Sequence, residues 1–140
     1  MFLLDTVVLS ELRKRRRDAG VLAWFASVSP DELFLSVVTV AEIERGIELR
    51  RADNPAFAAE LGDWLDLVVR GYADRVLPLD LAIARRWGRL AARIGNAGFD
   101  LAIAATAIEH GLTVVTRNES DFSPTGVAIL NPFGPRRQRP

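Results

Sequence analysis

The sequence contains no cysteine and a single histidine, His110, among its 140 residues. Without cysteine, a disulfide framework, a thiolate zinc site and a thiol nucleophile are all excluded. One histidine excludes a His-rich metal site, and His110 precedes Gly111 at an expected helix end, where it suits the helix dipole better than a serine–histidine triad. The side chains that remain as candidates for catalysis are therefore carboxylates, hydroxyls and arginines.

Long hydrophobic runs are also missing, although 49% of the residues are hydrophobic. The longest apolar stretches are far shorter than the ~20 residues of a membrane helix. Asp5 interrupts the apolar N-terminus before a signal-peptide pattern forms. We expect a cytoplasmic protein with one domain over residues 1–133, followed by a basic, frayed tail over residues 134–140.

Charge of one sign does not dominate, because 18 Lys and Arg residues balance 18 Asp and Glu residues. Lysine itself is nearly absent, since Lys14 is the only one. The bases are unevenly spread, and one block comprises Arg13, Lys14, Arg15, Arg16 and Arg17. We expect this block on a helix over residues 10–17, where it either binds RNA phosphates or forms a solvated helix face.

Strand-like and helix-like segments alternate along the chain. Apolar runs predict a first strand that ends near Asp5. They predict four more strands, over residues 33–38, 76–79, 112–116 and 127–130. Between them, apolar spacing predicts helices over residues 21–28, 39–51, 55–69, 81–94 and 100–110. Asn54 and Asp80 are the expected N-caps of the third and fourth of these helices, and Gly111 is the expected C-cap of the last. This order predicts an α/β fold, a three-layer α/β/α arrangement with a central, mainly parallel sheet.

Four acids follow the expected strands or open the expected helices: Asp5, Glu42, Asp100 and Asp121. Each has a purely structural interpretation as well. Asp5 and Asp100 could be helix N-caps, Glu42 could complete a capping box with Thr39, and Asp121 could lie in an ordinary polar loop over residues 117–125. In a parallel sheet, however, these positions converge on the crevice beyond the carboxyl ends of the strands.

Such a group of carboxylates repels itself, by about 3 kcal/mol for a pair ~5 Å apart at an effective dielectric constant of ~20. A divalent cation would offset that repulsion. Oxygen ligands without imidazole or thiolate favour Mg²⁺ or Mn²⁺. The reaction class that suits such a site is metal-assisted phosphodiester hydrolysis.

Five ordered motifs covering nearly the whole chain give it a family resemblance. They are Phe2-Leu-Leu-Asp5-Thr6-Val-Val-Leu-Ser10-Glu11, Ser36-Val-Val-Thr39-Val-Ala-Glu42-Ile-Glu-Arg-Gly46, Asp100-Leu-Ala-Ile103-Ala-Ala-Thr106-Ala, Val115-Thr116-Arg117-Asn118-Glu-Ser-Asp121-Phe122 and Leu130-Asn131-Pro132-Phe133. The chain resembles PIN-domain ribonuclease toxins of the VapC/FitB type, which belong to type II toxin–antitoxin systems.

The resemblance implies a PIN-like fold and a Mg²⁺- or Mn²⁺-dependent endoribonuclease. It implies that Asp5, Glu42, Asp100 and Asp121 are the catalytic, metal-binding acids, bordered by three polar residues, Thr6, Thr116 and Asn118. It also implies an RNA substrate such as a tRNA or mRNA, a VapB/FitA-type antitoxin and a homodimer.

The chain departs from the family pattern at two places. The family usually reads Asp-Thr-Asn where this chain has Val7, and the segment before Asp100 lacks the usual proline. An alternative is therefore a catalytically weakened PIN-domain protein that binds RNA or antitoxin without efficient cleavage. A flap or ribosomal-RNA processing nuclease of the same fold would need extra domains. Val7 and the single Lys14 argue against a haloacid-dehalogenase phosphatase and a receiver domain, respectively.

Overall fold

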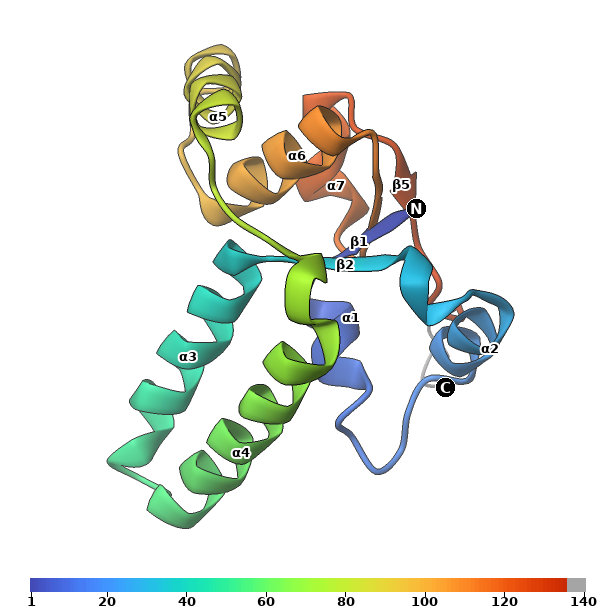
Figure 1. The fold of residues 1–140 in the computed structure, drawn as a ribbon, viewed down its shortest axis with the longest axis vertical. Helices are drawn as coiled ribbons and strands as arrows, with labels where there is room; N and C mark the ends of the chain where they lie inside the picture. The colour runs from blue at the N-terminus through green and yellow to red at the C-terminus, as the bar shows by residue number, and fades with distance from the viewer. Residues whose placement is uncertain (136–140) are drawn as a thin grey trace, which may run out of the picture.

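The computed structural model describes residues 1–135, so Arg136, Arg137 and Arg139 of the expected basic tail lie outside the described residues. A five-stranded, all-parallel sheet runs through the centre of the molecule in the order β3-β2-β1-β4-β5 (Figure 1). The strands are β1 (Phe2–Leu4), β2 (Leu33–Ser36), β3 (Val76–Leu77), β4 (Thr113–Val115) and β5 (Ile129–Leu130).

Helices cover both faces of this sheet (Figure 1). One side carries α1 (Thr6–Glu11), α2 (Ala19–Ser27), α3 (Val37–Arg51) and α4 (Pro55–Tyr72), and the other carries α5 (Leu81–Ile94), α6 (Phe99–His110) and α7 (Glu119–Phe122). Short 3-10 helices η1 (Pro30–Glu32), η2 (Ala73–Arg75) and η3 (Ser123–Thr125) complete the connections. The predicted three-layer α/β/α fold is confirmed. No helix within residues 1–135 has the length and hydrophobicity that a membrane span requires.

The strands alternate their side chains between two cores, as the pleat of a β-strand dictates. On β1, Leu4 packs with α1, α3 and α4, whereas Leu3 packs with α6 on the opposite face. On β4, Val115 and Val114 divide in the same way. Both faces are buried, which is why the strands of this parallel sheet are largely apolar.

Several helix ends follow directly from the sequence. Asn54 accepts a hydrogen bond from the Phe57 N–H at the start of α4, and Asp80 accepts one from Ile83 at the start of α5. Gly111 ends α6 in the left-handed conformation, with φ of 66°. These three expectations are confirmed, because each rests on a local hydrogen bond or on a φ that favours glycine.

The expected helix over residues 10–17 is wrong, since α1 begins at Thr6 and ends at Glu11. The basic block instead lies in the loop between α1 and α2. Glu11 is buried and accepts hydrogen bonds from the Asp18 N–H at 2.9 Å and the Lys14 Nζ at 2.8 Å. These contacts draw the loop back toward the end of α1 and replace the continued helix.

Two other expectations are also wrong. The start of α3 is capped by Ser36, whose side chain accepts from the Val38 N–H, so Thr39 and Glu42 do not form a capping box. Residues 117–125 are not an irregular loop, because they form α7 and η3 around the buried Phe122. A local hydrogen bond from Val38 to Ser36 decided the first case, and burial of Phe122 decided the second.

Arg75 ties the region before β3 to the start of β2. Its Nη1 donates to the carbonyls of Pro30 and Leu33 at 2.7 and 2.6 Å, and its Nη2 donates to Gly71 at 3.3 Å. The guanidinium also lies 4.9 Å from the centre of the Tyr72 ring. One planar fork therefore satisfies several backbone carbonyls at once.

We expect Arg75→Lys to lower the free energy of unfolding by about 1–2 kcal/mol, because a lysine ammonium cannot reproduce this fork. Urea denaturation would measure the loss. Arg70→Lys is the matched control, since Arg70 is exposed and bonds only the Asp66 carbonyl of its own helix. An Arg75→Lys protein as stable as the control variant would contradict this role.

Candidate active site

Asp5 lies at the carboxyl end of the central strand β1 and is only 3% exposed. Its Oδ1 accepts the Thr6 N–H at 2.8 Å, which makes it the N-cap of α1. Its Oδ2 accepts the Thr116 hydroxyl at 2.8 Å, and that hydroxyl in turn accepts the Asn118 N–H at 2.9 Å. Capping and a site role are thus compatible, because each uses a different carboxylate oxygen.

Glu42 lies in the second turn of α3, beyond the end of β2, and is half-buried. Its Oε1 accepts the Thr6 hydroxyl at 3.2 Å. Thr6 therefore bonds Asp5 through its backbone and Glu42 through its side chain. These contacts join two acids that lie 37 positions apart in the sequence.

Asp100 and Asp121 come from the opposite helical layer, in the first turns of α6 and α7. Gly98 occupies the N-cap position of α6 and no side chain caps that helix, so the N-cap interpretation of Asp100 is wrong. Asp121 is exposed. Neither carboxylate is committed to an ion pair among the described residues.

The electrostatics of Asp5 show that these acids share one region. Burial raises the pKa of Asp5 to about 6, despite the hydrogen bonds from Thr116 and Thr6 that lower it. The negative charges of Asp100 and Asp121 contribute to this raised value. Asp100 itself has a pKa raised by burial and by the charge of Asp121.

Glu42 belongs to the same electrostatic group. Burial raises its pKa, the hydrogen bond from Thr6 lowers it, and the charges of Asp5 and Asp100 raise it. The four predicted acids are therefore coupled through space across the carboxyl edge of the sheet. Like charges gathered in this way favour a cation or a proton at the site.

The donor set fits a hard divalent cation. It offers carboxylate and hydroxyl oxygens, the ligands that Mg²⁺ and Mn²⁺ prefer. Within residues 1–135 no lysine or arginine forms an ion pair with any of the four acids, so their charge is uncompensated. In the same range no three acidic or histidine side chains lie close enough together to hold one ion as they stand.

The basic loop after α1 has its own contacts. Glu11 forms an ion pair with Lys14, and the Lys14 carbonyl accepts a hydrogen bond from the Arg17 Nε at 3.1 Å. At the other end of the loop, Asp18 accepts from the Gly134 N–H at 3.1 Å. The loop is therefore fixed at both ends while its arginine side chains remain exposed.

A pocket of about 170 Å³ adjoins Thr6 and Glu42, between α1, α3 and α4. Three of the residues lining it, Ser10, Gly46 and Arg50, were not identified as site candidates from the sequence. The signal was present in part, since Glu42, Gly46 and Arg50 recur every four residues and so share one face of α3.

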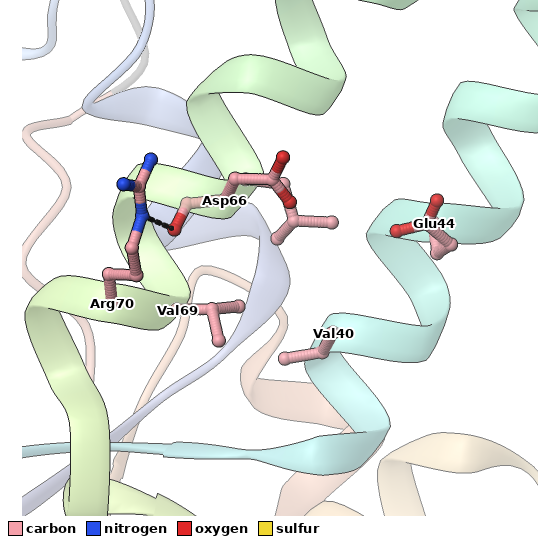
Figure 2. A pocket seen from close by; sticks show the side chains of 6 residues that line it. Val40, Glu44, Asp66, Val69 and Arg70 are labelled. Atoms are coloured by element: carbon pink, nitrogen blue, oxygen red, sulfur yellow. Dashed lines mark hydrogen bonds between the residues drawn. The ribbon is translucent and has the colours of Figure 1, made fainter.

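A second pocket, of about 360 Å³, lies on another side of α3, against α4 (Figure 2). Val40, Glu44 and Val69 line it, and Figure 2 shows the Arg70 Nε donating to the Asp66 carbonyl. None of the four coupled acids lines this pocket, since Glu44 is two residues and about 200° around the helix from Glu42. It is separate from the candidate active site.

The chain is similar to known proteins over nearly its whole length. The family model described as PIN domain matches residues 2–126. The chain is 39% identical to the VapC ribonuclease Y4jK of Sinorhizobium fredii, with 96% of this chain and 99% of that protein covered. It is 34% identical to the toxin FitB of Neisseria gonorrhoeae, with 95% and 99% covered.

A solved structure shows the same fold. The structure of FitAB bound to an IR36 DNA fragment contains a chain that superposes with a TM-score of 0.83 at 32% identity, covering 99% of this chain and all of that one. Sequence, fold and the position of the acids therefore lead to one conclusion: the chain belongs to the PIN-domain family, and VapC and FitB proteins are its near-full-length relatives.

Proposed function

We propose that this protein is a Mg²⁺- or Mn²⁺-dependent endoribonuclease, the toxin of a type II toxin–antitoxin pair. The observation that carries the proposal is the coupling of Asp5, Glu42, Asp100 and Asp121 around the buried end of β1. The VapC ribonuclease and FitB toxin among its relatives support both the activity and the biological role.

The chain's own residues have distinct parts in this proposal. The four acids would hold the metal, which when bound lowers the pKa of a coordinated water and offsets charge on the phosphate. Thr116 and Thr6 fix the orientation of Asp5 and Glu42 through their hydroxyls. Asn118 reaches this network through its backbone N–H and lies beside the site for contact with the substrate.

The basic block Arg13–Arg17 is suited to RNA phosphates. Four of its members are arginines and all five residues are exposed. Arginines that neutralise RNA phosphates supply affinity without base specificity. Asp5 and Thr6, in the active site, are separated from the block only by the remainder of α1.

We further propose two protein partners, a VapB/FitA-type antitoxin and a second copy of this chain. The relative FitB has been solved in the FitAB assembly, which supports an antitoxin partner. Exposed apolar residues on the two long helices of one layer, including Leu49, Leu67 and Val69, offer surface for such contacts.

A second candidate function rests on Val7. Val7 packs against the core around α1, α3 and α4, where it supplies apolar contact and no amide. A PIN-domain protein that binds RNA or antitoxin without efficient cleavage is consistent with that residue. The cleavage experiment below separates the two functions.

Purified, antitoxin-free protein should cut total RNA into discrete fragments with Mg²⁺ or Mn²⁺, and EDTA should abolish cleavage. Asp5→Asn should lower the rate by at least about 100-fold, since losing a metal-holding carboxylate costs more than losing a residue that merely supports one. Denaturing gels of the RNA over time would measure both effects.

Asp63→Asn is the matched control for the same change of charge, because Asp63 is exposed on α4 and lines none of the described pockets. It should cleave like the unmodified protein. Folded protein that leaves RNA intact with either metal would instead support the second candidate, and Val7→Asn should then restore cleavage.

The raised pKa of Asp5 also links the site to stability. Its pKa lies at about 6 in the folded protein against 3.8 for an unperturbed Asp, so the folded state holds that proton more tightly. Without metal, the associated stability is fully present at low pH and is lost as the pH rises through about 6. Glu42 and Asp100 shift in the same direction.

In EDTA, we expect Asp5→Asn to match the unmodified protein in stability near pH 4 and to exceed it by up to about 3 kcal/mol above pH 7. Thermal melting at a series of pH values would measure this difference. Adding Mg²⁺ at pH 7.5 should raise the Tm of the unmodified protein more than that of the variant. A difference that does not change with pH would show that Asp5 ionises normally.

A further inference from the structure

The pocket beside the acids is lined mainly by two helices that are arranged alike. On α1 and just beyond it lie Thr6, Ser10 and Arg13, and on α3 lie Glu42, Gly46 and Arg50. Each row has a residue of the acidic site at one end and an arginine at the other. The pocket therefore forms a short channel that runs from Glu42, the one acid of the four among its lining residues, to the two arginines.

The length of this channel follows from helix geometry. Glu42 and Arg50 are eight residues apart on one helix, which corresponds to about 12 Å along its axis. Flexible arginine side chains at the far end can bind a group that is close to the acids but not in contact with them. This separation suits a neighbouring phosphate on the same RNA strand as the phosphate placed at the acids.

Arg13 and Arg50 are held together by one aromatic ring. Their Cζ atoms lie 5.3 and 5.4 Å from the centre of the Phe57 ring. Among residues 1–135 neither guanidinium has an ion pair or a side-chain hydrogen bond. Two like charges gathered on one ring, neither of them in an ion pair among these residues, form a favourable site for an anion.

Gly46 lies between Glu42 and Arg50 in the lining of the channel. It lies inside α3, where glycine is less favourable than alanine, and a Cβ at this position would meet no atom within 4 Å. Neither a turn nor a close backbone contact requires glycine here. The missing side chain instead leaves room in the pocket between Glu42 and Arg50.

We propose that Arg13 and Arg50 form a phosphate-binding subsite, which holds the RNA backbone about one or two nucleotides from the bond placed at the acids. The strand lies over Gly46 between these points. Phe57 positions the two guanidiniums and makes no contact with the phosphate. This inference rests on the proposed ribonuclease function and names the residues that position its substrate.

RNA binding can be tested separately from cleavage in the Asp5→Asn protein. The probe is a fluorescein-labelled, mixed-sequence single-stranded RNA of about 20 nucleotides, followed by fluorescence anisotropy over a range of salt concentrations. Adding Arg13→Ala and Arg50→Ala should weaken binding about tenfold. The slope of log affinity against log salt should become shallower by about 0.7 for each phosphate that the protein no longer neutralises.

The control adds Arg45→Ala and Arg89→Ala, which remove the same charge from exposed positions on α3 and α5 outside the pocket. This control should keep the affinity and the salt slope of the Asp5→Asn protein. Equal weakening in the two double variants would overturn the subsite, because it would show a general effect of charge.

Gly46→Leu tests the channel without changing charge. It should weaken RNA binding, whereas Gly46→Ala, with a single small group, should bind more tightly than Gly46→Leu. Unchanged RNA binding by Gly46→Leu and by the Arg13 and Arg50 variant would overturn the subsite while leaving cleavage by the unmodified protein intact. RNA neither bound by Asp5→Asn nor cut by the unmodified protein would overturn the proposed function itself.

Discussion

The carboxylate of Asp5, buried at the end of the central strand, constrains the rest of the structure. The backbone N–H of Asp5 continues the pairing of β1 with β4 by donating to the Val115 carbonyl at 3.0 Å. Its two oxygens then bind the first residue of α1 and the hydroxyl of Thr116. One residue thus ends a strand, begins a helix and fixes a neighbouring loop. The energetic cost is that a carboxylate is buried, and burial raises the pKa of Asp5 to about 6.

That cost explains why the site is arranged around hydroxyl groups. The Thr116 hydroxyl donates to Asp5 and the Thr6 hydroxyl donates to Glu42. These hydrogen bonds partly offset the cost of burying the carboxylates, but neither hydroxyl carries a positive charge. The basic residues just beyond α1 make other contacts, because Lys14 bonds Glu11 and Arg13 stacks on Phe57. An arginine paired with Asp5 would stabilise the carboxylate but would also neutralise the charge that attracts a divalent cation.

The sequence predicted what depends on local chemistry or on strand order. The apolar strands, the caps at Asn54 and Asp80 and the acids beyond the strand ends all follow from short patterns. It did not predict features decided by particular side-chain contacts or by burial in the fold. The contacts of Glu11 with Asp18 and Lys14 end α1 early, and the burial of Phe122 orders the segment after β4 into short helices. Arg50 was missed for the same reason, since only the fold brings it to Phe57 beside Arg13.

The balanced net charge hides a separation of charge that the fold creates. Within residues 1–135, acids without an ion-pair partner lie at the carboxyl edge of the sheet, whereas two guanidiniums that also have no such partner lie at the far end of the adjoining pocket. A polyanion placed over the acids alone would be repelled. The arginines offset that repulsion from a distance, because they attract the backbone without neutralising the carboxylates. In the proposed function, one RNA strand is held by arginine at one point and meets the acids at another, and this arrangement requires that Arg13 and Arg50 stay unpaired with Asp5 and Glu42.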